Sequence, residues 1–154
     1  MIALVTIVEE PRGKTYLDLP QFAFRNNSLF SRVWRDEFIF GPSAIAVADL
    51  LRPYLVTVRR TDEWPGTQLF GDTATVRFYR MAPAGLSTLM EAGGLYAWIS
   101  PERPGDIAFY VDERNPWLGS IAHEKDAFVY PDAVDVQKLL TEVQGLKLER
   151  VAGK

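Results

Sequence analysis

The alternation of apolar and polar positions along the chain predicts helices and strands in mixed order. The clearest helix covers residues 132–144, where apolar side chains recur three and four positions apart; Asp132 is placed to cap its start and Gly145 ends it. A second helix covers residues 42–52 and stops before Pro53. Apolar side chains surround most of its circumference, which predicts that this helix is largely buried.

Two further segments have helical signals. Residues 83–92 begin with a proline suited to a first turn, and a glycine pair after them supplies a left-handed C-cap. Residues 26–37 carry apolar side chains at helical spacing, with Ser28 as the N-cap. We therefore expect about three or four helices.

Short apolar or alternating runs between glycine, proline and polar residues predict extended segments. They lie at residues 1–10, 15–24, 54–60, 73–81, 95–99, 106–111, 117–122 and 127–130. Pro20 places the second of them at a sheet edge, and residues 61–72 form a long connection. The predicted class is α+β, with a mainly antiparallel sheet of about five to seven strands and three or four helices packed on it. We expect one globular domain, residues 1–154.

Composition narrows the range of functions. The 154 residues contain no cysteine and one histidine, which is too few for a disulfide framework or the usual zinc sites. No glycine-rich phosphate loop is present, so we expect neither a metal nor a cofactor. The net charge of −3 argues against nucleic-acid binding. The apolar N-terminus meets Glu9 and Glu10 too early for a signal peptide or a membrane span, and we expect a cytoplasmic protein.

The only histidine, His123, follows a serine in "LGSIAHEKD". Ser120 and His123 have the chemistry of a nucleophile and its base, but alternation along a strand sets them on opposite faces. Both faces of this strand are apolar or small, which indicates a central strand covered on both sides. A histidine where such a strand ends commonly bonds a carbonyl or an acid. No catalytic residue is assigned.

Tryptophans and acids are the candidates for a binding surface. Residues 101–135 carry eight acidic and three basic side chains; such a surplus most often marks a solvated face and less often a surface for a basic partner. Exposed tryptophans contribute strongly to interfaces, although indole rings also cap hydrophobic cores. The candidate partner-binding residues are Trp64, Trp98, Trp117, Asp112, Glu113, His123 and Glu124.

One part of the chain resembles known proteins. From about residue 62 to residue 128, the order "EWPGT", "TATVRFYR", "LYAWISPERPGDIAFYV" and "PWLGSIAHEKD" is similar to small uncharacterised bacterial proteins of the immunity or accessory type. The similar region covers under half of the chain and includes no assigned catalytic residue. The resemblance implies a cytoplasmic binding protein.

These observations favour a non-enzymatic domain that binds another protein, as an immunity or accessory factor does. A basic toxin is the partner that the acidic segment would attract. Two alternatives stay open. One is a hydrolase that uses His123 with Glu124 or Asp126. The other is a regulatory module that binds a small ligand in a pocket between the sheet and the helices.

Overall fold

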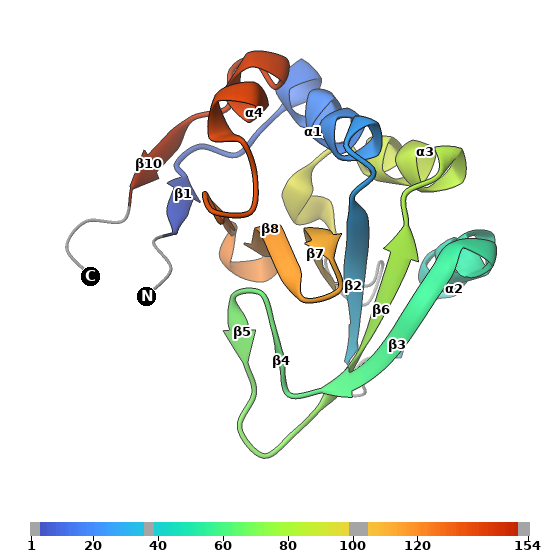
Figure 1. Cartoon of the computed structure of the whole chain (residues 1–154). Helices are drawn as coiled ribbons and strands as arrows, with labels where there is room; N and C mark the ends of the chain where they lie inside the picture. The colour runs from blue at the N-terminus through green and yellow to red at the C-terminus, as the bar shows by residue number, and fades with distance from the viewer. Residues whose placement is uncertain (1–3, 36–38, 99–104, 151–154) are drawn as a thin grey trace.

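The structure is a computed structural model that describes residues 4–35, 39–98 and 105–150. Within these residues the chain forms four α-helices and two β-sheets (Figure 1). The helices are α1 (Gly13–Arg25), α2 (Pro42–Leu51), α3 (Pro83–Ala92) and α4 (Val136–Glu142). The strands are β1 (Val5–Ile7), β2 (Leu29–Arg35), β3 (Leu55–Thr61), β4 (Glu63–Trp64), β5 (Thr67–Gln68), β6 (Ala74–Arg80), β7 (Gly105–Asp112), β8 (Asn115–Ile121), β9 (Asp126–Val129) and β10 (Leu148–Arg150).

The main sheet has the order β10-β1-β9-β8-β7-β2-β6-β3, and every neighbouring pair is antiparallel. The predicted α+β class is confirmed, but eight strands exceed the predicted five to seven. One unexpected strand is β10, which extends the sheet beyond β1. The other is β2, which lies between β6 and β7.

Helices α1, α3 and α4 lie together along one side of the sheet (Figure 1). Their buried side chains, such as Leu19, Leu89 and Leu139, share one core cluster with Phe109 and Val129 of the strands. A second, smaller cluster lies on the opposite, open face of the sheet, where the β4–β5 hairpin packs. The described helices do not span a membrane, since none is both long and apolar enough to do so.

Residues 15–24, predicted as an edge strand, belong to helix α1, and that prediction is wrong. The buried residues Tyr16, Leu19 and Ala23 recur at helical spacing. Pro20 lies inside the helix and is buried, so its ring packs in the core while its missing N–H weakens one turn. The Tyr16 hydroxyl donates to the Leu89 carbonyl and ties α1 to α3.

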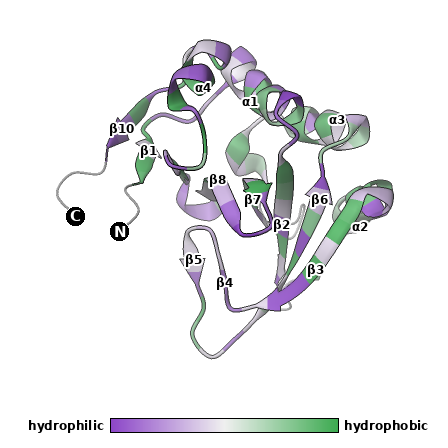
Figure 2. Cartoon of the chain, viewed as in Figure 1, coloured by the Kyte–Doolittle hydropathy of each residue, from purple (hydrophilic) through white to green (hydrophobic). Residues whose placement is uncertain are grey.

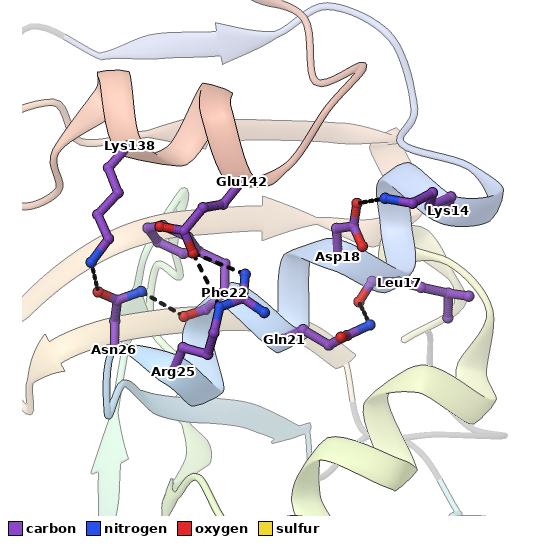
Figure 3. Close-up of polar contacts among 9 residues, drawn as sticks. All are labelled: Lys14, Leu17, Asp18, Gln21, Phe22, Arg25, Asn26, Lys138 and Glu142. Atoms are coloured by element: carbon purple, nitrogen blue, oxygen red, sulfur yellow. Dashed lines mark hydrogen bonds and ion pairs between the residues drawn. The ribbon is translucent and has the colours of Figure 1, made fainter.

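The polar side chains of α1 gather on its other side (Figure 3). Lys14 pairs with Asp18 one turn later at 2.6 Å. Arg25 reaches across to Glu142 of α4 at 2.9 Å, and the Lys138 ammonium of α4 donates to the Asn26 side chain at 2.9 Å. The helix is therefore amphipathic, with one face in the core and one face in water.

Residues 26–37 were predicted as a helix, and that prediction is also wrong, because residues 29–35 form strand β2; residues 36 and 37 lie outside the described residues. Phe30 joins the helix-side core, whereas Val33 joins the cluster on the open face. Pairing with β6 and β7 on both sides overrides the local helical pattern. The predicted N-cap Ser28 is buried and instead accepts the indole N–H of Trp117 at 3.0 Å.

Helices α2 and α4 both form, but the burial of α2 and the bounds of α4 differ from the sequence predictions. Helix α2 forms where predicted but is not largely buried, because only Ala44 and Leu51 of it are buried. Helix α4 is shorter than residues 132–144 and starts after Asp135. The Asp135 carboxylate, not that of Asp132, caps it by accepting from the Lys138 backbone N–H at 3.1 Å.

The remaining predictions mostly agree with the structure. Strands β1 and β6 and helix α3 form within the predicted segments, and strands β3, β7, β8 and β9 overlap theirs but differ by one or two residues at an end. Gly93 has the left-handed conformation expected of a C-cap, with φ of 78°. Residues 95–97 form a short 3-10 helix, η2 (Leu95–Ala97), and not a strand. The predicted connection at residues 61–72 contains the small β4–β5 hairpin.

Candidate functional site

The β4–β5 hairpin covers part of the open face of the sheet and is fixed to it by a polar contact. Trp64 is buried in the second cluster, and its indole N–H donates to Asp106 Oδ2 at 3.0 Å. The other oxygen, Asp106 Oδ1, accepts the Ala122 backbone N–H at 3.0 Å. One carboxylate thus joins the hairpin, β7 and the turn after β8.

Two glycines allow the tip of the hairpin to approach the sheet. A Cβ atom at Gly119 of β8 would lie 2.6 Å from the Phe128 ring and 2.8 Å from Pro65 Cβ. Gly66 has φ of +88°, and a Cβ there would lie 2.7 Å from the same ring. Any larger residue at Gly66 or Gly119 would push the hairpin off the sheet. The hairpin can therefore lie on the sheet only because both positions are glycine.

Between the hairpin and the turn that joins β7 to β8 lies a cavity of about 430 Å³, which we call the open-face cleft. A cavity of this size is within the range that holds small organic ligands. Its lining comes from β3, the hairpin, β6, β7, the β7–β8 turn and the residues around β8 and β9. The lining residues are Arg59, Thr61, Glu63, Trp64, Pro65, Val76, Phe78, Tyr110, Glu113, Arg114, Pro116 and Tyr130.

Aromatic rings form the floor of the open-face cleft. The Phe78 and Tyr110 ring centroids lie 5.1 Å apart, and the Arg59 guanidinium lies 5.0 Å from the Phe78 centroid. The Tyr110 hydroxyl shares a hydrogen bond of 2.9 Å with Ser31 Oγ. Burial raises the pKa of Tyr110 to about 12, and burial also raises the pKa of Tyr130. Both phenols are therefore neutral near pH 7.

Charged side chains of both signs surround this floor: Arg59, Glu63, Glu113 and Arg114. Within the described residues, none of the four forms an ion pair. The turn that carries Glu113 and Arg114 is ordered by Asp112. The Arg114 backbone N–H and the Asn115 amide both donate to its carboxylate, and these bonds hold the pKa of Asp112 below its ordinary value.

The structure divides the candidate partner-binding residues among separate places. Trp64 and Glu113 line the open-face cleft, and Asp112 lies in the adjoining turn. Trp98 and Trp117 are buried in the core on the helix side. The Arg32 guanidinium lies 4.1 Å from the Trp98 ring centroid, and Trp117 stacks on Phe109 with centroids 5.3 Å apart.

A β-bulge sets the direction of Trp117. Phe109 pairs with Leu118 while Tyr110 pairs with Pro116, so Trp117 is the extra residue on β8. Simple alternation groups Trp117 with Gly119, but Trp117 and Leu118 both lie in the helix-side core. Sequence periodicity alone does not show this bulge.

His123 and Glu124 are exposed in a 3-10 helix, η3 (Ala122–Glu124), after β8. The Asp112–Glu113 turn lies at the other end of that strand, about 20 Å away for seven extended residues. The described acids of this segment, in residues 105–135, thus do not form one patch. No hydrogen bond joins the His123 ring to another part of the described chain, so the predicted bond to a carbonyl or an acid is absent there.

Ser120 is not available to His123. It is buried in β8, and its hydroxyl donates to the Ile107 carbonyl at 2.6 Å. The prediction that the two side chains cannot share a proton agrees with this placement. In the described ranges, His, Cys, Asp and Glu do not gather in any group of three or more that could hold a metal ion.

A second notable surface lies at the opposite end of the sheet from β10. Strand β3 is the last strand in the order, so one of its edges is unpaired among the described strands. Helix α2 runs through a 3-10 turn, η1 (Arg52–Tyr54), directly into it. Five apolar residues of α2 and β3 are exposed, and we call them the β3 edge surface: Ile45, Leu50, Leu55, Val56 and Val58.

The colouring in Figure 2 shows the apolar stretch of β3 next to α2 and its hydrophilic end toward the hairpin. Val58 is 53% exposed, and Leu50 has the same value. The elements around this surface, residues 42–61 and 74–80, contain five arginines and one acid, Asp49, which pairs with Arg52 at 2.5 Å. These elements therefore carry a positive net charge although the whole chain has a net charge of −3.

The sequence interpretation missed Arg59, Phe78, Tyr110 and Tyr130 as members of one site. Alternation in residues 73–81 does place Val76 and Phe78 on one face. No local sequence signal predicts the strand order that brings β3, β6 and β7 into one site, because strand order depends on contacts between residues that are distant in sequence.

Comparison of the chain with protein-family models, with curated proteins and with solved structures finds no match. The resemblance of residues 62–128 to immunity or accessory proteins therefore stays a prediction.

Proposed function

We propose that this protein is a non-enzymatic protein-binding module that docks its partner on the β3 edge surface. The observation that carries the proposal is the exposure of Leu55, Val56 and Val58 on an unpaired edge strand of seven residues. Unpaired strand edges readily accept another strand, and most proteins keep them short or cover them. An edge that is long, apolar and open is a surface suited to a partner.

The mode that fits this surface is strand addition. An extended segment of the partner pairs with the free backbone groups of β3, and its side chains meet the exposed valines. Ile45 and Leu50 of α2, which precede β3 in the chain, are also exposed. Backbone pairing supplies affinity in this mode, and the side chains supply specificity.

The charge around the β3 edge surface favours an acidic partner. Five arginines and one acid, Asp49, lie in residues 42–61 and 74–80, and opposite charge speeds association and excludes partners of like charge. This reverses the sign expected from residues 101–135, whose described acids lie at both ends of β8. An immunity or accessory role would be one instance of such binding.

The test compares capture by the wild-type chain with capture by Val58→Glu. The substitution places a negative charge on the free edge, so we expect recovery of a specific partner from the organism that encodes the chain to fall by about tenfold or more. The captured partner should carry an acidic extended segment, and its binding should weaken as salt is added. Quantitative mass spectrometry of the recovered proteins measures the effect.

The matched control is Val8→Glu, because Val8 is 49% exposed and follows β1 at the other end of the sheet. This variant should recover the same partner as the wild-type chain. Equal recovery by the Val58 variant would contradict the proposal, and so would the absence of any partner that depends on this edge.

A further inference from the structure

The open-face cleft is distinct from the free edge of β3. Arg59 and Thr61 of β3 reach it with side chains on the open face of the sheet, whereas strand addition uses the backbone at the far side of the strand. We propose that the open-face cleft is a second binding site, for a small zwitterionic molecule with a flat apolar body. This proposal does not depend on the docking of a protein partner.

The floor of the cleft is apolar and is suited to bind a flat apolar group. Phe78 and Tyr110 are 2% and 3% exposed, so their rings lie beneath the surface of the cleft, and the half-buried residues Pro65, Pro116 and Tyr130 present the apolar surface that a ligand meets. The Tyr110 hydroxyl bonds Ser31 and the Trp64 indole N–H bonds Asp106, so both groups already have partners. Offset or edge-to-face contact of a flat ring with the Tyr130 ring is favourable.

The rim determines the charge that the ligand should carry. The wall made by β3 and the hairpin contributes Arg59 and Glu63, and the opposite wall at the β7–β8 turn contributes Glu113 and Arg114. Each wall thus holds one cation and one anion, and none of these four residues has an ion-pair partner within the described residues. Such a rim is complementary to a molecule that carries both charges.

A ligand with a single charge would satisfy half of this rim and be repelled by the other half. An uncharged ligand would leave all four charged groups without a partner while displacing water from them, which is costly. A zwitterion can meet an arginine with its anionic group and a glutamate with its ammonium group through charge-assisted hydrogen bonds. The expected class is therefore that of a free aromatic amino acid.

The experiment uses four probes with the same indole ring: L-tryptophan, indole-3-propionate, tryptamine and N-acetyl-L-tryptophan amide. Each is added to the ¹⁵N-labelled full chain up to about 10 mM, which would nearly saturate a site with a Kd of 1 mM. We expect L-tryptophan to shift the backbone amides of Thr61, Val76, Phe78 and Tyr110 saturably. Its affinity should exceed that of each singly charged probe by about tenfold, the value of one charge-assisted contact.

Two variants sharpen the result. Arg59→Gln and Glu113→Gln should each weaken L-tryptophan binding by about tenfold, because each removes one charge from an opposite wall. Arg12→Gln and Glu91→Gln are the matched controls, since both residues are exposed and neither lines the cleft. The amide spectra of all four variants report whether they keep the fold.

Three outcomes would overturn the proposal. One is the absence of saturable shifts at the residues of the cleft. Another is equal binding of all four probes, which would show a pocket that responds only to the ring. The third is tightest binding of the uncharged N-acetyl amide, which mimics an internal peptide residue and would indicate a polypeptide segment as the occupant.

Discussion

Helices α1 and α2 are both rich in apolar residues, but they bury very different shares of them. In α1 the apolar residues Tyr16, Leu19 and Phe22 enter the core, and the polar ones pair at the surface (Figure 3). In α2 only Ala44 and Leu51 are buried, and Ile45 and Leu50 remain about half exposed. An apolar composition therefore does not show that a helix is in the core. It shows that the helix needs a partner, which can be another molecule.

The same contrast applies to the two ends of the sheet. At one end β10 covers the edge of β1 with three residues, and Lys147 pairs with Glu9 beside it at 2.6 Å. At the other end β3 exposes valines along an unpaired edge. The first end is short and charged, as protected edges commonly are. The second is long and apolar, which supports its proposed use in binding.

The largest expected effect is on stability, and it distinguishes α1 from α2. Leu19→Ala in α1 should lower the free energy of unfolding by about 2–5 kcal/mol, because the residue is fully buried and its removal leaves a cavity. Leu50→Ala in α2 is the matched change at a half-exposed site and should cost less than about 1 kcal/mol. Urea denaturation of both variants measures the difference. Equal losses would show that α2 is as well packed as α1.

At alkaline pH, the ionisation of Tyr110 on the open face should lower the free energy of unfolding by about 3 kcal/mol. Burial raises the pKa of Tyr110 to about 12 from an ordinary value of 10.0. Because the folded pKa is the higher one, this contribution to stability is present below pH 10 and is lost between about pH 10 and 12. Each unit of the shift corresponds to about 1.4 kcal/mol.

The control for the Tyr110 effect is Tyr110→Phe, which removes the ionisable group but keeps the ring. The stability of this variant should fall less steeply over the same range of pH. The phenolate absorbance step near pH 12 should also be smaller in this variant, and Tyr96, whose pKa is raised to about 12 as well, should account for what remains. If both proteins lose stability with the same slope, the ionisation of Tyr110 does not contribute to alkaline unfolding.

The smallest effect concerns the surface ion pairs of the two helices. Glu142→Gln breaks the half-exposed contact between Arg25 and α4 and should cost about 0.5–1 kcal/mol. Asp49→Asn breaks a more exposed pair with Arg52 of η1 and should change stability by less than about 0.3 kcal/mol. Thermal unfolding at low and high salt checks both values. A larger effect in α2 would contradict the contrast between the helices.

Local sequence patterns correctly predicted the helices and strands whose local preference agrees with their tertiary packing. Helix α3 and strands β6 to β9 have clear boundaries at proline, glycine or polar residues, and they form where expected. In contrast, α1 contains a proline at a position that suggests an edge strand, and β2 has apolar residues at helical spacing. In both cases tertiary packing overrides the local preference.

Sequence patterns predicted less of the candidate sites than of the fold. Trp64 and Glu113 were predicted as binding residues and do line the open-face cleft, together with their sequence neighbours Arg59 and Tyr110, but these two stretches of chain lie far from each other in sequence. Their convergence depends on the strand order and on the fold of the hairpin over the sheet. The apolar character of α2 was visible in the sequence, and only the structure shows that no core covers it.

The central claim is that the partner adds a strand to β3, and amide hydrogen exchange of the chain with its captured partner tests this claim most directly. Strand addition predicts that the backbone amides of Leu55–Thr61 that point away from β6 exchange much more slowly in the complex, because they gain hydrogen bonds. The amides of the opposite edge strand, Leu148–Arg150, should be unchanged. Protection confined to α2, to the open face or to β10, with β3 exchanging as in the free protein, would contradict the claim.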